Sequence, residues 1–383
     1  MILMNIYEIF IFSIRLLYLP FMLCPIQDNK VVVRVGSGHG YGEHAKYIVQ
    51  RALDENLNWD IVWVVHSYGP VNDLPSAVRQ VKEHSFKSFY EFATARVWID
   101  STRKRSYIQK KKQQYYIQTW HGFGPKTSSE KNLPYFHRRS ISHDLKMTDI
   151  YLSNNRLLTS YYRDDFGYDG LVLEVGFPRC DLFYSGSRSL VLEKVCSRLN
   201  IPKNSKIILY APTYRQDASL DQYKLNVNRW VEVVSDRFGG EWVFVLRLHP
   251  AISHLSSILV KESENIIDAS EYLDVQELLY SADILITDYS SCMFDFALTR
   301  RLVLLYTPDF EKQNNLRGFL MDLNELPFLK SNTEEGLFLK IRDYDSETYL
   351  KNLENTFSKY HMCDNGTASK SVVDWIENKI NNP

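Results

Sequence analysis

The residues best suited to chemistry in this chain stand where apolar, strand-like runs end. The clearest example is Thr287-Asp288-Tyr289-Ser290-Ser291, which follows the apolar run 284–286 and precedes a segment with helical spacing. The free N–H groups and the positive dipole at a helix start favour an anion, and serine hydroxyls add hydrogen-bond donors. The simpler alternative is that Ser290 or Ser291 only caps the helix. This segment therefore predicts either an anion site or a helix cap.

Four further strand-like runs end in charged or aromatic residues. The segments that follow them are Trp120-His121-Gly122, Gly176-Phe177-Pro178-Arg179, Ala211-Pro212-Thr213-Tyr214-Arg215 and Arg247-Leu248-His249-Pro250. The carboxyl ends of parallel strands share one edge of a sheet, and ligands of α/β proteins collect at that edge. Guanidinium groups, which these segments contribute, match pairs of phosphate oxygens. A single histidine or arginine here more often serves structure, so it is the combination that indicates a pyrophosphate site.

Strand-like runs alternate with helical patterns along most of the chain, which is typical of a parallel α/β sheet. The expected strands are 31–35, 61–65, 97–100, 115–119, 172–175, 207–210, 242–246, 284–286 and 302–305. The expected helices lie near 43–53, 190–199, 227–237, 275–281, 292–298, 349–360 and 368–379. Because the polar stretch 184–188 separates two such series, we expect two Rossmann-like parallel-sheet domains that face a central cleft.

A glycine-rich segment, 36–42, follows the first expected strand. It is similar to a dinucleotide-binding fingerprint, but its spacing is wrong and no acidic partner follows the second strand. We therefore expect a loop that lets another group approach the backbone closely.

Bulk composition excludes several classes of protein. The 383 residues carry a net charge of −1 and are 45% hydrophobic, so the chain is an ordinary globular protein without overall attraction to nucleic acid. Its five cysteines are scattered, which favours a reducing compartment over a disulfide framework or a zinc site. We expect Cys292 to pack as a small apolar residue rather than to react.

Residues 1–24 are almost entirely apolar, with Asn5, Glu8 and Arg15 on one helical face. A signal peptide is disfavoured because the segment lacks a basic start and a small-residue cleavage site. A membrane-spanning helix would be short and would contain charges and a proline. An interfacial helix fits best, and a helix docked on the protein is the alternative. The basic run 110–112 would add attraction to anionic lipid, or it forms a solvated loop.

The ordered motifs resemble those of the CDP-glycerol glycerophosphotransferase family of teichoic acid and capsule synthesis, from about residue 30 to 322. The resemblance rests on the motifs quoted above and also on Lys126, Asp181, Asp274, Asp283, Asp295 and Arg317-Gly318-Phe319. The resemblance implies a GT-B-like fold and transfer of glycerol phosphate, or a related alditol phosphate, from CDP-glycerol or CDP-ribitol. The implied acceptor is a hydroxyl of a lipid-linked saccharide or polymer, and CMP is released.

The resemblance also implies where the protein works and how the chain is divided. It places the enzyme peripherally on the inner, cytoplasmic face of the bacterial cell membrane, and leaves open whether the chain forms a homo-oligomer. We expect a membrane-associating helix, an acceptor-side Rossmann-like domain, a CDP-donor-binding Rossmann-like domain and a C-terminal helical segment. Their expected bounds are 1–25, 26–185, 186–345 and 346–383.

Carried over by motif, the two essential histidines of the family match His121 and His249. The expected donor-binding residues are Lys126, Arg179, Pro212, Thr213, Arg215, Arg247, Thr287, Ser290, Ser291 and Asp295. An attacking hydroxyl must lose a proton, and we assign that proton to His121, with His249 and Arg247 stabilising the departing CMP. The reverse assignment of the two histidines stays open. We expect no cofactor and no metal bound by the protein, because no acidic cluster suits one.

Several positions depart from the pattern of the family. Phe123-Gly124-Pro125-Lys126 stands where Thr-Pro-Leu-Lys is usual, the segment 127–130 lacks a common glycine, and Cys180 replaces an asparagine. These departures leave open which alditol phosphate is moved, and whether the enzyme primes, polymerises or decorates a capsule. Two rival functions are a GT-B glycosyltransferase that uses a nucleotide sugar and an inactive scaffold of a polymer-assembly complex.

Overall fold

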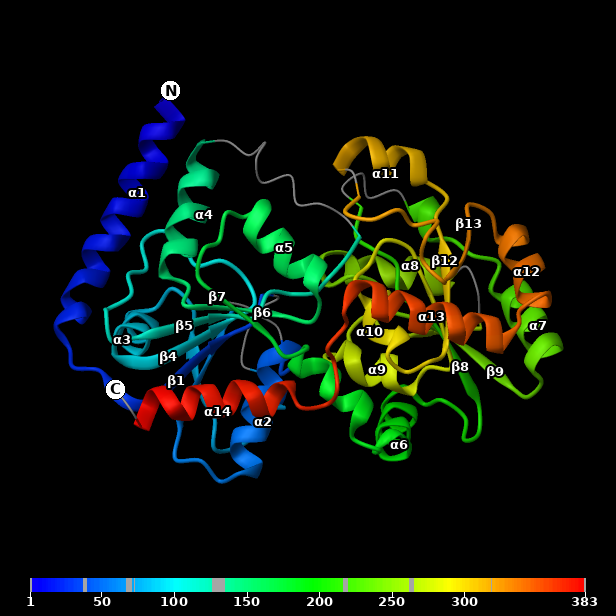
Figure 1. Cartoon of the computed structure of the whole chain (residues 1–383), viewed down its shortest axis with the longest axis horizontal. Helices are drawn as coiled ribbons and strands as arrows, with labels where there is room; N and C mark the ends of the chain where they lie inside the picture. Colours follow the sequence, from blue (N-terminus) through cyan, green and yellow to red (C-terminus); the bar gives the residue numbers. More distant parts are fainter. Residues whose placement is uncertain are drawn as a thin grey trace. The chain divides into compact units, whose positions relative to one another are not determined.

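The computed structural model describes residues 2–36, 40–66, 71, 73–125, 135–215, 220–261, 265–317 and 319–381. Contacts divide the chain into two compact units. The first unit contains residues 1–121, 130–181 and 363–383, and the second contains 122–129 and 182–362. Each unit is built on its own parallel sheet (Figure 1). The prediction of an α/β protein with two parallel-sheet domains is therefore confirmed.

The sheet of the first unit has the strand order β3-β2-β1-β4-β5-β6-β7, and every pairing in it is parallel. Its strands are β1 Gln27–Arg34, β2 Asp60–Val65, β3 Arg79–Lys82, β4 Ala95–Asp100, β5 Tyr115–Gln118, β6 Ile150–Ser153 and β7 Leu171–Glu174. In β1, Val31 pairs with Ile61 of β2 and with Val97 of β4. The order reverses between β1 and β4, which is where open α/β sheets bind ligands.

Helices cover both faces of this first sheet because its strands alternate their side chains. Val31 and Val33 belong to the core under α2 Glu43–Asp54 and α14 Ala368–Asn381, whereas Val32 points to the other face. That other core holds Tyr18 of the N-terminal helix and residues of α3 Phe86–Thr94. Figure 1 shows α14 beside α2, so the end of the chain returns to the first unit. The remaining helical elements of the unit are α1 Ile2–Tyr18, η1 Leu19–Leu23, α3 Phe86–Thr94, α4 Tyr135–Met147, α5 Arg156–Asp164 and the start of η3 Pro178–Tyr184.

The sheet of the second unit has the order β10-β9-β8-β11-β12-β13 and is also parallel throughout. Its strands are β8 Lys206–Tyr210, β9 Trp242–Leu246, β10 Ile266–Asp268, β11 Ile284–Thr287, β12 Leu302–Tyr306 and β13 Leu329–Ser331. The order reverses between β8 and β11, as it does between β1 and β4 in the first sheet. Both expected motifs that flank this reversal, 211–215 and 287–291, therefore start at its carboxyl edge.

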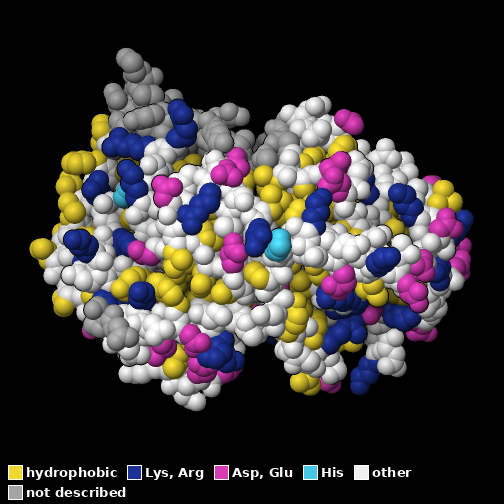
Figure 2. Space-filling model, in the orientation of Figure 1, with side chains coloured by type: hydrophobic (Ala, Val, Ile, Leu, Met, Phe, Trp, Pro, Cys, Tyr) yellow, Lys and Arg dark blue, Asp and Glu magenta, His cyan; other side chains and the backbone are white. Residues whose placement is uncertain are grey.

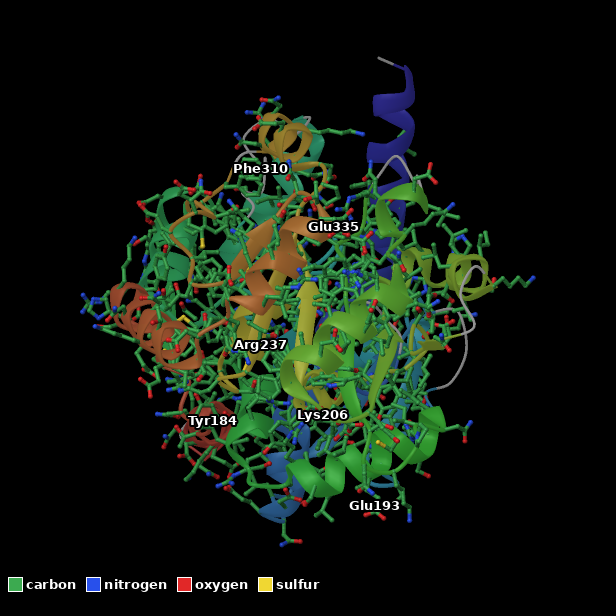
Figure 3. The ribbon with its side chains drawn as sticks, turned by 90° about the vertical axis from the view of Figure 1, so that its right-hand side faces the viewer. Tyr184, Glu193, Lys206, Arg237, Phe310 and Glu335 are labelled. Carbon is green, nitrogen blue, oxygen red and sulfur yellow. The ribbon has the colours of Figure 1, made fainter. Side chains whose placement is uncertain are left out.

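Two helices of the second unit, α7 Val227–Phe238 and α12 Glu334–Arg342, pack against each other through aromatic rings. The Trp230 ring of α7 lies 4.8 Å from the Phe338 ring of α12, and both helices can be followed in Figure 3. The indole of Trp230 also donates a hydrogen bond to Glu334 at 2.7 Å. The helical elements are α6 Arg188–Leu199, η4 Leu220–Tyr223, α7 Val227–Phe238, η5 Pro250–Leu255, α8 Ser256–Lys261, α9 Val275–Ser281, α10 Cys292–Ala297, α11 Phe310–Arg317, α12 Glu334–Arg342 and α13 Ser346–Tyr360.

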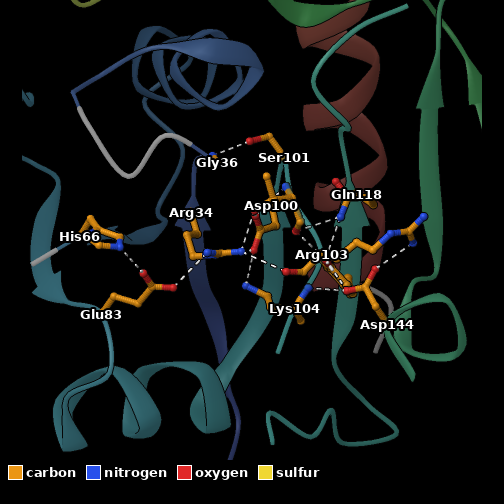
Figure 4. A network of polar contacts seen from close by, with 12 residues as sticks. Arg34, Gly36, His66, Glu83, Asp100, Ser101, Arg103, Lys104, Gln118 and Asp144 are labelled. Carbon is orange, nitrogen blue, oxygen red and sulfur yellow. Dashed lines mark hydrogen bonds and ion pairs between the residues drawn. The ribbon is translucent and has the colours of Figure 1, made fainter. Parts of the chain in front are cut away.

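A buried polar network joins the strand ends of the first sheet (Figure 4). Arg34 donates to Asp100 at 2.8 Å and to Glu83 at 3.0 Å, and the Lys104 ammonium lies 2.7 Å from Asp100. Burial alone would raise the pKa of Asp100, but the charges of Arg34 and Lys104 lower it below its ordinary value. The network fixes the edge from which the segments after β4 and β5 depart.

Asp144 of α4 belongs to the same network, but its pKa is shifted in the opposite direction from that of Asp100. It accepts hydrogen bonds from the Lys104 backbone N–H at 2.6 Å and from the Tyr116 hydroxyl at 3.0 Å, and Arg103 lies 3.6 Å away. Burial nevertheless raises the pKa of Asp144 to about 6. The folded protein therefore keeps a proton on Asp144 in a pH range where the unfolded chain releases it.

We predict that Asp144→Asn removes a pH dependence of stability. The contribution of Asp144 is fully present below the unfolded pKa near 4 and is lost as pH rises through about 6. A shift of ~2 pKa units corresponds to about 2–3 kcal/mol. Chemical denaturation at pH 4.5 and 7.0 should show the unfolding free energy of the variant rising relative to that of wild type by most of this amount, because part of the contribution is already lost at pH 4.5. If the unfolding free energies of the variant and of wild type change with pH by the same amount, Asp144 is not the group that holds this proton.

Candidate functional site

His121 follows β5 in the first unit, and its side chain is exposed. The chain reaches it through Trp120, which has a left-handed backbone with φ of 57° and whose N–H donates to the Gln118 side chain at 3.0 Å. The Trp120 and His121 rings lie 4.2 Å apart, and the Arg103 guanidinium lies 5.3 Å from the Trp120 ring centre. A strained, aromatic-supported turn therefore holds this histidine at the strand end.

Arg179 lies in the segment after β7 and is buried. Its guanidinium donates to the His121 carbonyl at 2.8 Å, so the structure brings together two predicted site residues of the first unit. Asp364 fixes the preceding turn by accepting from the Phe177 N–H at 2.8 Å. Gly176 is required in that turn, because its φ is 88° and a Cβ there would lie 3.0 Å from the Asp364 Cα.

Asp181 anchors the other end of the same segment. Its carboxylate accepts from the backbone N–H groups of Ala368 at 3.1 Å and Ser369 at 2.7 Å, at the start of α14. A carboxylate at a helix start is favoured by the free N–H groups and the helix dipole. The motif 176–181 is therefore held by the returning C-terminal segment, which places Arg179.

The segment after β8 in the second unit is held by Asp288. The Asp288 carboxylate accepts from the Thr213 N–H at 3.0 Å and lies 2.9 Å from the Arg215 guanidinium. Arg215 is buried and also donates to both carboxylate oxygens of Asp309, at 2.9 and 3.0 Å. Burial would lower the pKa of Arg215, but Asp309 and Asp288 raise it above its ordinary value. Arg215 is thus engaged by two carboxylates and positions the loop that carries Pro212 and Thr213.

The hydroxyl segment after β11 leads into α10, a helix of six residues. Ser291 stands at its N-cap position, but its side chain makes no capping bond. The Ser290 hydroxyl accepts from the Cys292 N–H at a long 3.4 Å. Both serines are half-buried. The simple capping interpretation therefore does not account for Ser291.

Three other residues predicted to bind the donor are occupied in packing. The Thr287 hydroxyl donates to the Ala211 carbonyl at 2.7 Å, and Asp295 accepts from the Gln276 side chain at 2.9 Å. Pro212 is buried. These contacts tie β8, α9 and α10 together and so fix the position of the serines.

The segment Gly122–Pro125, directly after His121, belongs to the second unit. The Phe123 ring lies 4.9 Å from the Phe294 ring, and the Pro125 carbonyl accepts from the Leu320 N–H at 2.6 Å. A Cβ on Gly124 would lie 3.6 Å from the Ser291 backbone N. Of the departures at 123–125, Gly124 therefore lies beside Ser291 of the hydroxyl segment, whereas Lys126 lies outside the described residues.

His249 follows β9, and its ring nitrogen Nδ1 accepts from the Ala251 N–H at 3.2 Å. A backbone N–H can only donate, so the neutral ring must carry its proton on Nε2. Partial removal of the ring from water and the charge of Arg247 lower the pKa of His249, which favours the neutral ring. The imidazole is exposed, lies 5.7 Å from the Tyr214 ring and presents an N–H donor rather than a base.

Arg247 supports this histidine from the same strand end. Its guanidinium donates to the carbonyls of Leu248 at 2.6 Å and Ser270 at 2.7 Å. Burial lowers the pKa of Arg247, and its Nε has no hydrogen-bond partner among the described residues. These two hydrogen bonds fix the guanidinium at the carboxyl edge of β9.

Some important residues lie outside the sequence predictions. Asp309 and Asp364 act over long sequence separations and carry no local signal, whereas Asp288 lies inside a motif that was already singled out. Cys292 is buried, and burial raises the pKa of its thiol to about 11, which is consistent with a packing role. Within the described residues, no cluster of three or more His, Cys, Asp or Glu is arranged to hold a metal.

Two Rossmann-type sheets with histidines, arginines and hydroxyls at their carboxyl edges place the protein in the GT-B-like class. The model of the family described as CDP-Glycerol:Poly(glycerophosphate) glycerophosphotransferase matches residues 16–378. The chain belongs to this family of enzymes.

Comparisons with individual proteins agree with this membership. The chain is 29% identical over 374 residues to a teichoic acid poly(glycerol phosphate) polymerase of Bacillus spizizenii, covering 92% of this chain and 93% of the relative. It is 29% identical to the polymerase of the same description from Staphylococcus epidermidis, covering 93% of this chain but only 51% of the relative. The chain thus spans about half the length of that relative. A structure of the wall teichoic acid polymerase TagF superposes with a TM-score of 0.84 at 28% identity, covering 99% of this chain and 97% of that one.

We predict that Arg215→Met destabilises the second unit strongly. It leaves Asp288 and Asp309 buried without a cation, a loss of about 3–5 kcal/mol for a broken buried pair. Arg215 lowers the pKa of Asp309, so the difference from wild type should shrink as pH falls and the carboxyl protonates. Thermal unfolding at pH 7 and pH 4 measures both effects. Arg229→Met, at an exposed ion pair of α7, is the matched control; equal effects of the two variants would contradict the assignment.

Proposed function

We propose that this protein transfers glycerol phosphate, or a related alditol phosphate, from a CDP-alditol to an acceptor hydroxyl in teichoic acid synthesis. The family match over residues 16–378, which includes both histidine segments, is the observation that carries the proposal. The donor is CDP-glycerol or CDP-ribitol, the acceptor is a lipid-linked saccharide or polymer, and CMP leaves. Neither a metal nor a cofactor takes part.

In the proposed reaction the acceptor oxygen forms a bond to the distal phosphorus of the donor. The hydroxyl proton passes to His121, and the bond between that phosphorus and the bridging oxygen of CMP breaks. His249 donates from Nε2 to the bridging oxygen, in keeping with the tautomer that Ala251 imposes. Arg247 and the hydroxyls of Ser290 and Ser291 bind the diphosphate. Thr213 and Arg179 complete the donor contacts, with Arg215 holding the Thr213 loop.

We predict that glutamine substitutions separate the two histidine roles. A glutamine amide donates a hydrogen bond but takes up no proton, so His249→Gln should retain more activity than His249→Ala. His121→Gln should be as inactive as His121→Ala, with CMP release lowered by about 10²–10⁴-fold. Single-turnover CMP release from CDP-glycerol measures both pairs. If His121→Gln keeps most of its activity while His249→Gln is inactive, His249 is the base and His121 is the hydrogen-bond donor.

We also propose that the N-terminal helix attaches the enzyme peripherally to the cytoplasmic face of the membrane, where a lipid-linked acceptor is found. Tyr18 is wholly buried and its hydroxyl donates to the Gln109 carbonyl at 3.0 Å, so one side of the helix is docked on the protein. The other side exposes large apolar side chains, which gather along the left-hand edge in Figure 2. These exposed residues are Ile9, Phe12, Leu16, Leu17, Leu19 and Leu23.

The chemistry of this helix suits a membrane surface better than its interior. No helix of the described residues is both long and apolar enough to cross a bilayer. A helix with an apolar outer side lies in the interfacial plane, and its affinity grows with the apolar area that it buries. One side of the helix is thus docked on the protein, and the exposed apolar residues of the other side support the proposed interfacial attachment.

We predict that replacing Phe12, Leu16 and Leu23 together by serine weakens membrane attachment without unfolding the protein. Each side chain is 49% exposed or more, so its loss should leave the core intact. Flotation with anionic vesicles should shift the variant into the unbound fraction. The matched control is Leu190→Ser with Leu339→Ser, two exposed leucines of the second unit. Equal flotation of both variants and wild type would rule out this helix as the anchor.

A further inference from the structure

The Arg103 guanidinium contacts two aromatic rings of the first unit. It lies 4.5 Å from the centre of the Phe166 ring and 5.3 Å from the centre of the Trp120 ring. These two rings are 5.0 Å apart at an interplanar angle of 68°, so the cation binds both members of an edge-to-face pair. Trp120 in turn lies 4.2 Å from the ring of His121. Ring contacts therefore connect Arg103 and Phe166 to the proposed catalytic base.

The Asp144 carboxylate alone does not explain the position of Arg103. The Arg103 Nη1 lies 3.6 Å from it, too far for a good hydrogen bond, and burial raises the pKa of Asp144 to about 6 (Figure 4). The same nitrogen donates to the Tyr151 hydroxyl at 3.2 Å. Because the Arg103 side chain is only 14% exposed, water competes weakly with its contacts to the two rings. The aromatic rings therefore take a substantial share in holding the guanidinium.

His121 is exposed, and its imidazole lies against the Trp120 ring. An exposed side chain can occupy several rotamers, and only some of them direct a ring nitrogen to a given hydroxyl. A catalytic group that is misplaced by ~1 Å can lose about 100-fold in rate. A Trp120 ring that is held in one position excludes the His121 rotamers that would overlap it.

We propose that Arg103 and Phe166 are positioning residues of the transfer reaction, which fix the Trp120 ring and thereby keep the His121 imidazole directed at the acceptor hydroxyl. This rests on the proposed function, in which that hydroxyl gives its proton to His121 and its oxygen bonds to the donor phosphorus as CMP leaves. Arg103 and Phe166 take up no proton themselves. A purely structural role would lower the stability of the fold but not the kcat of the folded enzyme.

Substitutions at Arg103 separate these two roles. Arg103→Met removes the cation and keeps an unbranched side chain, so kcat for CMP release should fall about 10–100-fold, with the KM for CDP-glycerol within about twofold of wild type. Arg103→Lys should recover part of the loss, because an ammonium also binds aromatic faces. The matched control is Arg300→Met, which removes a guanidinium 5.3 Å from the Phe357 ring in the second unit and should leave both constants unchanged.

Phe166→Leu tests the same support from its other member, without removing a charge. It should lower kcat in the same direction as Arg103→Met. Because both substitutions act through the Trp120 ring, the double variant should lose much less than the product of the two single losses. Circular dichroism of each variant verifies that the measured enzyme is folded. Fully multiplicative losses, or a folded Arg103→Met with the kcat of wild type, would overturn the proposal.

A spectroscopic measurement keeps the inference separate from turnover. The ring current of Trp120 shifts the ¹H signals of an imidazole 4.2 Å away, and signals absent from His121→Gln identify those of His121 in the full chain labelled with ¹³C-histidine. These signals should move toward random-coil values in Arg103→Met and Phe166→Leu but not in Arg300→Met, and unmoved signals would contradict the proposal. If wild type releases no CMP from CDP-glycerol, the proposed function fails, while the NMR signals still decide whether Arg103 and Phe166 fix the His121 ring.

Discussion

A buried ion pair between an arginine and an aspartate joins the two strands at which each sheet reverses its order. In the first unit Arg34 of β1 pairs with Asp100 of β4, and in the second Arg215 after β8 pairs with Asp288 after β11. A charge is retained in the interior only when its partner is held in place, so each pair fixes the separation and direction of two strand ends. The polar segments that leave these edges depend on that constraint.

Each pair also connects its edge to more distant parts of the chain. Arg34 reaches Glu83 beyond β3, and Arg215 reaches Asp309 beyond β12. The segment that contains Arg179 is likewise bonded to the C-terminal part of the chain: Asp181 accepts from the Ser369 N–H, and Asp364 accepts from the Phe177 N–H. The loops that carry Arg179, Pro212 and Thr213 are therefore anchored by charged groups from distant parts of the chain.

Much of this arrangement can be predicted from the sequence, and what cannot has a physical reason. Long apolar runs such as 242–246 carry their own signal, whereas β10 and β13 have only three residues and no buried alternation. The motif 211–215 marks a strand end correctly, but the partners of Arg215 lie 73 and 94 residues further along, beyond any local pattern. The tautomer of His249 likewise depends on a backbone N–H that the sequence cannot place.

The central claim is that the chain moves an alditol phosphate and not a sugar. The most direct measurement incubates the full chain with a glycerol phosphate oligomer and, in parallel, CDP-glycerol, CDP-ribitol and a UDP-sugar, and analyses nucleotide and oligomer by mass spectrometry. The account predicts that CMP appears with one CDP-alditol and that the oligomer gains the mass of an alditol phosphate unit. Release of UDP with addition of a bare sugar, or no turnover of either CDP-alditol, would contradict it.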